Sequence, residues 1–197
     1  MLFSKQFSIV GETKNTVIKI IIASIVGGII MFVWQFMSWG ALDFHRSSQE
    51  YTPNQDEIIS FLNTKFDKDG GYFLPNSPEG TSSEDMEAQM KDSMGKPWVQ
   101  IYYHKEMNMS MGMNMFRGLA VDIFTIFLLA WILSKISGNT FGTTVMVSLA
   151  TGLMCFFNTQ YVNHIWYETF DVNASFVDAI VSWGLVGAWL GWWLNRK

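Results

Sequence analysis

The methionines between residues 86 and 115 are the side chains of this sequence whose type and spacing most suggest chemistry. Five of them alternate with other residues in the run Met107–Met115, which reads MNMSMGMNM. Soft thioether ligands favour Cu(I) over harder ions, and the preceding histidine would add an imidazole. The candidate ligands for Cu(I) or silver are His104, Met107, Met109, Met111, Met113 and Met115.

The same methionines also allow an interpretation without a metal. Met86, Met90 and Met94 are spaced as one stripe along a short helix. Flexible thioether side chains fill irregular gaps and make adaptable contact surfaces. A methionine stripe next to a membrane is therefore typical of a surface that lies on lipid or on a neighbouring protein, and we take this as the first interpretation.

Two acids, Asp122 and Asp178, lie inside long apolar runs. Acids within membrane spans are costly, and they usually face the interior of a helix bundle or a water-filled cavity. Together with nearby polar side chains they could form one cluster that binds a proton, an ion or a polar headgroup. The predicted members of this cluster are Arg117, Asp122, Asn158, Gln160, His164 and Asp178. The alternative is structural: Asp178 begins a helix at the interface, and Asp122 pairs with another span.

The remaining reactive residue types form no catalytic pattern. The histidines, His45, His104 and His164, have no HxxxH spacing, and solvated or interface positions explain them. The single cysteine, Cys155, excludes an internal disulfide and a Cys/His zinc pattern. The sequence has no nucleophile elbow, phosphate-binding glycine loop or dinucleotide fingerprint, so we expect a protein that is not an enzyme.

Four apolar runs must position these residues. Only 15% of the chain is charged, against about 25% in ordinary soluble domains. A helix of about 20 apolar residues spans a bilayer core, and the first run is too long for a cleavable signal peptide. We expect an α-helical integral membrane protein with four transmembrane helices, at Val17–Trp39, Phe116–Leu133, Thr143–Tyr161 and Phe176–Leu194.

Residues 43–115 form a polar lobe between the first two spans. Residues 43–106 hold 12 acids and six bases. The pattern predicts a helix that starts at Thr52–Pro53 and ends at Gly70–Gly71, a strand at 72–74, a helix at 84–94 and a strand at 98–104. We therefore expect three parts: residues 1–42, the small α+β lobe 43–115, and the hairpin module 116–197.

Small residues within the spans indicate close helix packing. They let neighbouring backbones approach each other in a membrane. The predicted packing positions are Gly27, Gly28, Gly184, Gly187, Ala188 and Gly191.

The distribution of charge predicts the orientation. Four spans would place Lys14, Lys19, Lys135, Arg196 and Lys197 on one side. The positive-inside rule then places both termini in the cytoplasm and the lobe on the outer face. The net charge of −4 makes nucleic acid an improbable partner.

Four motifs stand out along the chain: GGxxxFxWxxxS from Gly27, the element GYFLP at 71–75, the strand IYYH at 101–104, and the Trp/Gly-rich last helix from Trp183 to Trp193. Together they resemble an uncharacterised group of small bacterial four-helix inner-membrane proteins. The resemblance implies the topology and the bacterial cytoplasmic membrane, and no activity.

We therefore expect a non-catalytic accessory or interaction subunit of a bacterial inner-membrane assembly. Its partners would be the lipid bilayer and other membrane-protein subunits, or further copies of itself. Two alternatives stay open: a Cu(I)-binding membrane protein that uses the methionine run, and a proton- or ion-coupled membrane protein that uses Asp122 and Asp178.

Overall fold

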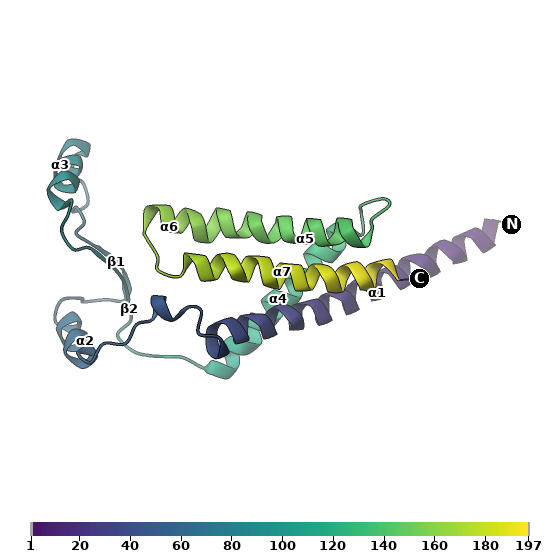
Figure 1. Cartoon of the computed structure of the whole chain (residues 1–197), viewed down its shortest axis with the longest axis horizontal. Coiled ribbons are helices and arrows are strands. Elements are labelled where there is room, and N and C mark those ends of the chain that lie inside the picture. The colour runs from purple at the N-terminus through teal and green to yellow at the C-terminus, as the bar shows by residue number, and fades with distance from the viewer. Residues whose placement is uncertain (1, 197) are drawn as a thin grey trace. The chain divides into compact units, whose positions relative to one another are not determined.

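The structure is a computed structural model that describes residues 2–196, with side chains from Thr16 onward. The chain forms two compact units (Figure 1). The helical unit comprises Met1–Glu50 and Ser110–Lys197, and the small unit comprises Tyr51–Met109.

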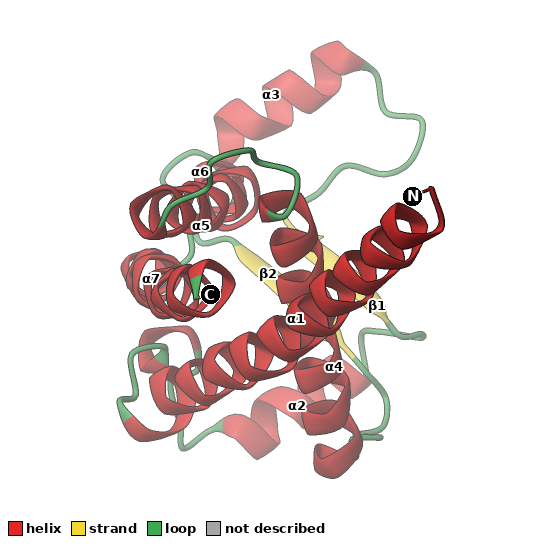
Figure 2. Ribbon diagram, turned by 90° about the vertical axis from the view of Figure 1, so that its right-hand side faces the viewer, coloured by secondary structure: helices red, strands yellow, loops and turns green. Residues whose placement is uncertain are grey.

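Four helices of the described chain are long and apolar enough to cross a membrane. They include α1 (Leu2–Phe36), α4 (Met111–Leu133), α5 (Phe141–Cys155) and α7 (Val172–Asn195). Helix α1 packs against both α4 and α7, and α7 packs against α5 (Figures 1 and 2). The helices therefore follow one another in space as α4, α1, α7 and α5, and each end helix has one main partner.

Small residues bring these helices close together. A Cβ at Gly28 would lie 2.7 Å from the backbone N and Cα of Ile123, and a Cβ at Gly27 would lie 2.7 Å from Ile126. A Cβ at Gly187 would lie 2.9 Å from Ser148, and one at Gly191 would lie 2.8 Å from Phe141. Glycine at these positions therefore sets the spacing of the α1–α4 and α5–α7 pairs.

The other two predicted packing positions are looser. A Cβ at Gly184 would meet Leu149 at 3.6 Å, an ordinary contact, and Ala188 is exposed. Gly152, which was not among the predicted positions, is tighter, because a Cβ there would overlap the indole of Trp183.

Polar contacts join α1 to the end of α7. The indole N–H groups of Trp189 and Trp193 donate to the carbonyl oxygens of Ala23 (3.0 Å) and Lys19 (2.8 Å). The Lys19 ammonium in turn donates to the carbonyl of Leu194 at 3.1 Å. A cation suits the negative end of a helix dipole.

The small unit contains two helices and one two-stranded antiparallel sheet. Its elements are α2 (Gln55–Asn63), β1 (Gly70–Leu74), α3 (Ser83–Ser93) and β2 (Val99–Tyr103). Residues 70 and 74 of β1 pair with residues 103 and 99 of β2. Phe66 stacks on Tyr72 with ring centroids 3.9 Å apart and also contacts Tyr103. The Tyr103 hydroxyl donates to Asn63 at 2.7 Å, which fixes the end of α2 to β2.

The observed elements begin and end at different residues from those expected. Helix α4 starts at Met111, so three methionines of the run are helical. The third span continues through a π-helical turn, η3 (Phe156–Tyr161), and α6 (Val162–Trp166).

In the small unit, α2 ends at Asn63 and the two glycines at 70–71 belong to β1. Asn54 is the N-cap residue of α2, while the hydroxyl of Thr52 accepts from the Asn54 N–H at 3.3 Å.

The division into units also differs from the expected boundaries at 43 and 115. Residues 43–50 and 110–115 belong to the helical unit. The physical reasons are that α4 extends to Met111 and that residue 45 is bonded to α7, as described below.

Candidate functional site

The described side chains bring several titratable groups together at the start of α7. Asp171 is the N-cap residue of this helix, and Asp178 lies seven residues further on. Residues i and i+7 share one helix face. The side chain of Asp171 makes no capping bond to its own helix, so its carboxylate is free to bind elsewhere.

The segment after α1 supplies the partner of these two acids. Helix α1 ends in a π-helical turn, η1 (Met37–Ala41), and Asp43 adopts a left-handed conformation with φ of 56°. The backbone N–H of Phe44 then donates to the Ser38 carbonyl at 3.1 Å. This reversal of the chain places His45 beside α7, where only 4% of it is exposed.

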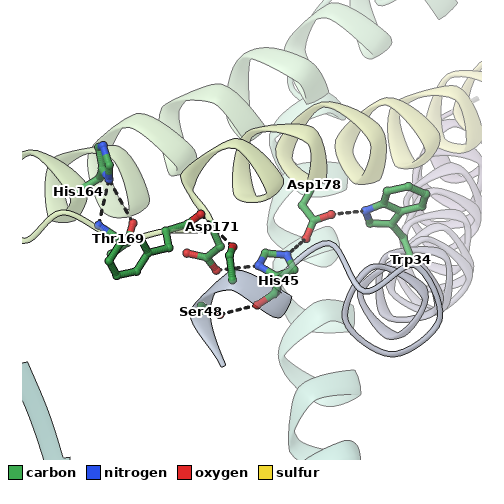
Figure 3. Close-up of polar contacts among 9 residues, drawn as sticks. Trp34, His45, Ser48, His164, Thr169, Asp171 and Asp178 are labelled. Carbon is green, nitrogen blue, oxygen red and sulfur yellow. Dashed lines mark hydrogen bonds and ion pairs between the residues drawn. The ribbon is translucent and has the colours of Figure 1, made fainter. Parts of the chain in front are cut away.

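His45 bridges the two carboxylates (Figure 3). Its Nδ1 lies 2.8 Å from Oδ2 of Asp171, and its Nε2 lies 3.0 Å from Oδ2 of Asp178. The other oxygen of Asp178 accepts from the Trp34 indole N–H at 2.9 Å. The imidazole also stacks on Trp39, with ring centroids 3.9 Å apart and planes parallel within 1°. We call His45, Asp171, Asp178 and Trp34 the His45 cluster.

Counting hydrogen-bond donors limits the proton arrangements that satisfy the His45 cluster. An ionised carboxylate only accepts hydrogen bonds, and a neutral imidazole has one donor and one acceptor nitrogen. Both ring nitrogens face carboxylate oxygens. All contacts are satisfied when the imidazole carries both protons, as an imidazolium between two carboxylates, or when one carboxyl group is protonated.

Asp43 and Arg46 lie close to His45 in the sequence, and their opposite charges neutralise each other. The Arg46 guanidinium donates to Asp43 at 2.9 Å. This hydrogen bond and the Asp43 charge, with a smaller contribution from Glu50, raise the pKa of Arg46 above its ordinary value. Both side chains are exposed, so this pair is a solvated neighbour of the cluster.

The predicted grouping of polar side chains around Asp122 and Asp178 is not formed. Asp122 accepts from the Gln35 amide at 3.2 Å, whereas Asp178 contacts Trp34 and His45. Helix α1 lies between α4 and α7, so it supplies each acid with a separate partner.

The other predicted members of that grouping are also elsewhere. The Nδ1 of His164 accepts from the Thr169 N–H at 3.1 Å, and Arg117, Asn158 and Gln160 are exposed. Asp122 itself is 5% exposed, and its Oδ2 has no hydrogen-bond partner among the described residues.

No protein-family model, curated protein or solved structure matches this chain. The resemblance to small bacterial four-helix proteins therefore stays a prediction that rests on the motifs alone.

The predicted Cu(I) ligands are divided between the two compact units. Met107 and Met109 lie in an irregular segment of the small unit, while Met111, Met113 and Met115 lie in the first turns of α4. All five are exposed, and Met107 is the most exposed at 86%. His104 lies 3.7 Å from Asp69. Within residues 16–196, no three His, Cys, Asp or Glu side chains gather as a metal site.

His45 was predicted to be a solvated or interface histidine and not a member of the site. The i, i+7 spacing of Asp171 and Asp178 was a usable signal, because it predicts two acids on one face of α7. The histidine comes from a segment more than a hundred residues earlier, and nothing local to it indicates this contact.

Proposed function

We propose that this chain is a non-catalytic accessory or interaction subunit of a bacterial cytoplasmic-membrane assembly. Both termini would lie in the cytoplasm, and the small unit would lie on the outer face. The flanking charges support this orientation through the positive-inside rule. The four apolar helices support a multi-pass anchor.

One observation carries the proposal: the small unit leaves most of its large apolar side chains uncovered. Among its residues, all of which the structure describes, Phe66 and Tyr103 are the buried apolar ones. Exposed apolar side chains occur on α2, on α3, on the two strands and directly before β2. They are Ile58, Ile59, Phe61, Phe73, Leu74, Met86, Met90, Trp98, Val99 and Tyr102.

This surface suits contact with another protein. Large exposed apolar side chains are typical of surfaces that contact other molecules, and interface centres are enriched in aromatic residues and methionine. Phe61, Met90 and Tyr102 are 59%, 69% and 75% exposed. A two-stranded sheet on its own is only marginally stable in water, so a partner that covers this unit would also stabilise it.

The experiment compares two triple variants of the full chain, purified from native membranes in mild detergent. The test variant carries Phe61→Ser, Met90→Ser and Tyr102→Ser. The matched control carries Asp56→Ser, Glu84→Ser and Gln100→Ser, at exposed polar positions on the same three elements.

The proposal expects a co-purifying chain to be lost from the test variant and kept by the control. Near-ultraviolet circular dichroism of the Phe66, Tyr72 and Tyr103 cluster would check that the small unit stays folded. Equal recovery of all co-purifying chains with both variants would contradict the proposed surface.

A further inference from the structure

The end of the helix bundle where α7 finishes beside α1 carries bases and no acids among the described residues (Figure 1). Residues 16–42, 123–167 and 179–196 contain no Asp or Glu, and their bases are Lys19, Lys135 and Arg196. Every ion pair of the described side chains involves a different base. The positive charge of these three side chains is therefore not neutralised within residues 16–196.

Lys19 and Arg196 are held next to each other at this end. The Lys19 ammonium donates to the carbonyl oxygens of Leu194 at 3.1 Å and of Arg196 at 2.6 Å. The Arg196 guanidinium lies over the rings of Trp192 and Trp193, 5.2 Å and 4.9 Å from their centroids. Cation–π contacts of this kind stabilise a guanidinium on an indole face, so both cations are in place before any ligand binds.

Several hydrogen-bond donors of this pair remain unused. An ammonium has three N–H donors and a guanidinium has five. Lys19 uses two of its three on carbonyl oxygens. Within residues 16–196, the Arg196 guanidinium contacts the two indole faces and donates no hydrogen bond. Its planar edge therefore stays available, and this edge matches two oxygens of a phosphate at once.

We propose that Lys19 and Arg196 bind the headgroup phosphate of an anionic phospholipid at the end of α1 and α7. The proposal goes beyond the subunit role and does not depend on it, because the ligand is a lipid and not a protein.

The position of the pair along the helices favours a lipid over a free anion. The first apolar span begins at Thr16 and the last ends at Asn195. Both cations thus lie within one turn of a span end, at the depth of the headgroups. Trp192 is 54% exposed beside the guanidinium, and an amphipathic indole suits this interface.

The charge of the site favours an anionic headgroup over a zwitterionic one. A zwitterionic headgroup brings an ammonium group, and no acid in residues 16–42, 123–167 or 179–196 could bind it. Basic side chains next to a span attract lipids with a net negative charge.

The test is native mass spectrometry of the full chain, released from micelles of an uncharged detergent after titration with one lipid. The probes are phosphatidylglycerol and phosphatidylcholine with the same acyl chains, and inorganic phosphate is the competitor. The test variant is Arg196→Gln. The matched control is Lys135→Gln, because Lys135 lies 5.8 Å from the Trp131 ring centroid and loses the same charge. Both positions are exposed, so both variants should fold.

We expect the wild type to bind one phosphatidylglycerol about tenfold more tightly than phosphatidylcholine. Arg196→Gln should lose about tenfold in affinity, the effect of one hydrogen bond to a charged group, whereas Lys135→Gln should bind as the wild type does. Equal affinity of the wild type for the two lipids would overturn the proposal without any variant.

Two further outcomes would also overturn it. Equal affinities of the Arg196→Gln and Lys135→Gln proteins for phosphatidylglycerol would show that the lipid does not bind at this pair. Displacement of phosphatidylglycerol by inorganic phosphate, beyond the effect of sodium chloride at equal ionic strength, would show a site for a free anion instead of a lipid.

Discussion

His45 is the most tightly held histidine of the three, because both of its nitrogens and one ring face are in contact with other side chains. His104 and His164 have looser surroundings. Because His45 is buried between two carboxylates, it is not a solvated surface residue. The sequence-based interpretation of all three as solvated or interface histidines therefore misses the special position of His45.

Asp178 should contribute measurably to the stability of the helical unit. Asp178→Asn keeps the shape but removes the charge that two donors, from Trp34 and His45, share. We expect a loss of about 1–3 kcal/mol, the usual cost of impairing a hydrogen bond to a charged group, here one that is half-buried. Thermal unfolding in detergent would show a lower midpoint.

The control for Asp178 is Asp92→Asn, because the Asp92 carboxylate pairs with Lys96 on the surface of α3. Surface ion pairs contribute about 0–1 kcal/mol, so the midpoint of thermal unfolding of the Asp92→Asn protein should change little. Equal effects of the two substitutions would show that the His45 cluster adds nothing to stability.

The methionine run should tolerate leucine. Replacing Met107, Met109, Met111, Met113 and Met115 by leucine keeps an exposed apolar surface but removes every thioether. We expect the same co-purifying chains as with the wild type, because adaptable apolar contact does not require sulfur. Titration of both proteins with Cu(I) distinguishes a contact surface from a metal site. If the wild type binds Cu(I) saturably and the leucine variant does not, the copper site is favoured.

At the scale of elements, hydrophobic periodicity and length predict the four long helices, because each apolar run is long enough to cross a membrane. The ends of the helices are less predictable. Met111–Met115 read as a linker in the sequence and form the start of α4, since unbranched methionine is also a good helix former. The π-helical turns at Met37–Ala41 and Phe156–Tyr161 have no marker in the sequence.

Gly28 should be the least replaceable of the predicted packing residues. A Cβ there would lie 2.7 Å from the backbone of Ile123, which cannot move like a side chain. We expect Gly28→Ala to destabilise the α1–α4 pair by about 1–3 kcal/mol, the usual cost of overpacking. A lower thermal midpoint in detergent would measure this effect.

Gly112→Ala is the matched control, because it also lies in one of the two helices, yet a Cβ there meets nothing within 4 Å. Alanine is the better helix former, so its stability should stay equal or rise. A Gly28→Ala protein as stable as the control would mean that α1 and α4 are not packed this closely.

At the scale of the whole molecule, composition predicts a multi-pass protein with a polar insert, and the structure has four apolar helices and a small two-stranded unit. The order α4, α1, α7, α5 depends on contacts between distant segments. The sequence has small residues on several helix faces, but it does not indicate which of these faces pack against each other. The His45 cluster belongs to the same class of long-range contacts.

The proposed orientation has a direct test by labelling. In a Cys155→Ser background, we expect a cysteine at Asn108 to react with a membrane-impermeant maleimide on intact cells. A cysteine at Ser137, in the turn between α4 and α5, should react only after the membrane is permeabilised. Both positions are exposed, so reaction of Ser137→Cys on intact cells would reverse the orientation.

The central claim, that the chain serves as an accessory subunit, is tested most directly by its native mass. The protein would be extracted from its own membranes in mild detergent, and every co-purifying chain would be identified. The account predicts a complex of defined mass, well above the 22.5 kDa of one chain, with at least one different protein in a fixed ratio. A lone monomer, or an oligomer of this chain alone, would contradict it.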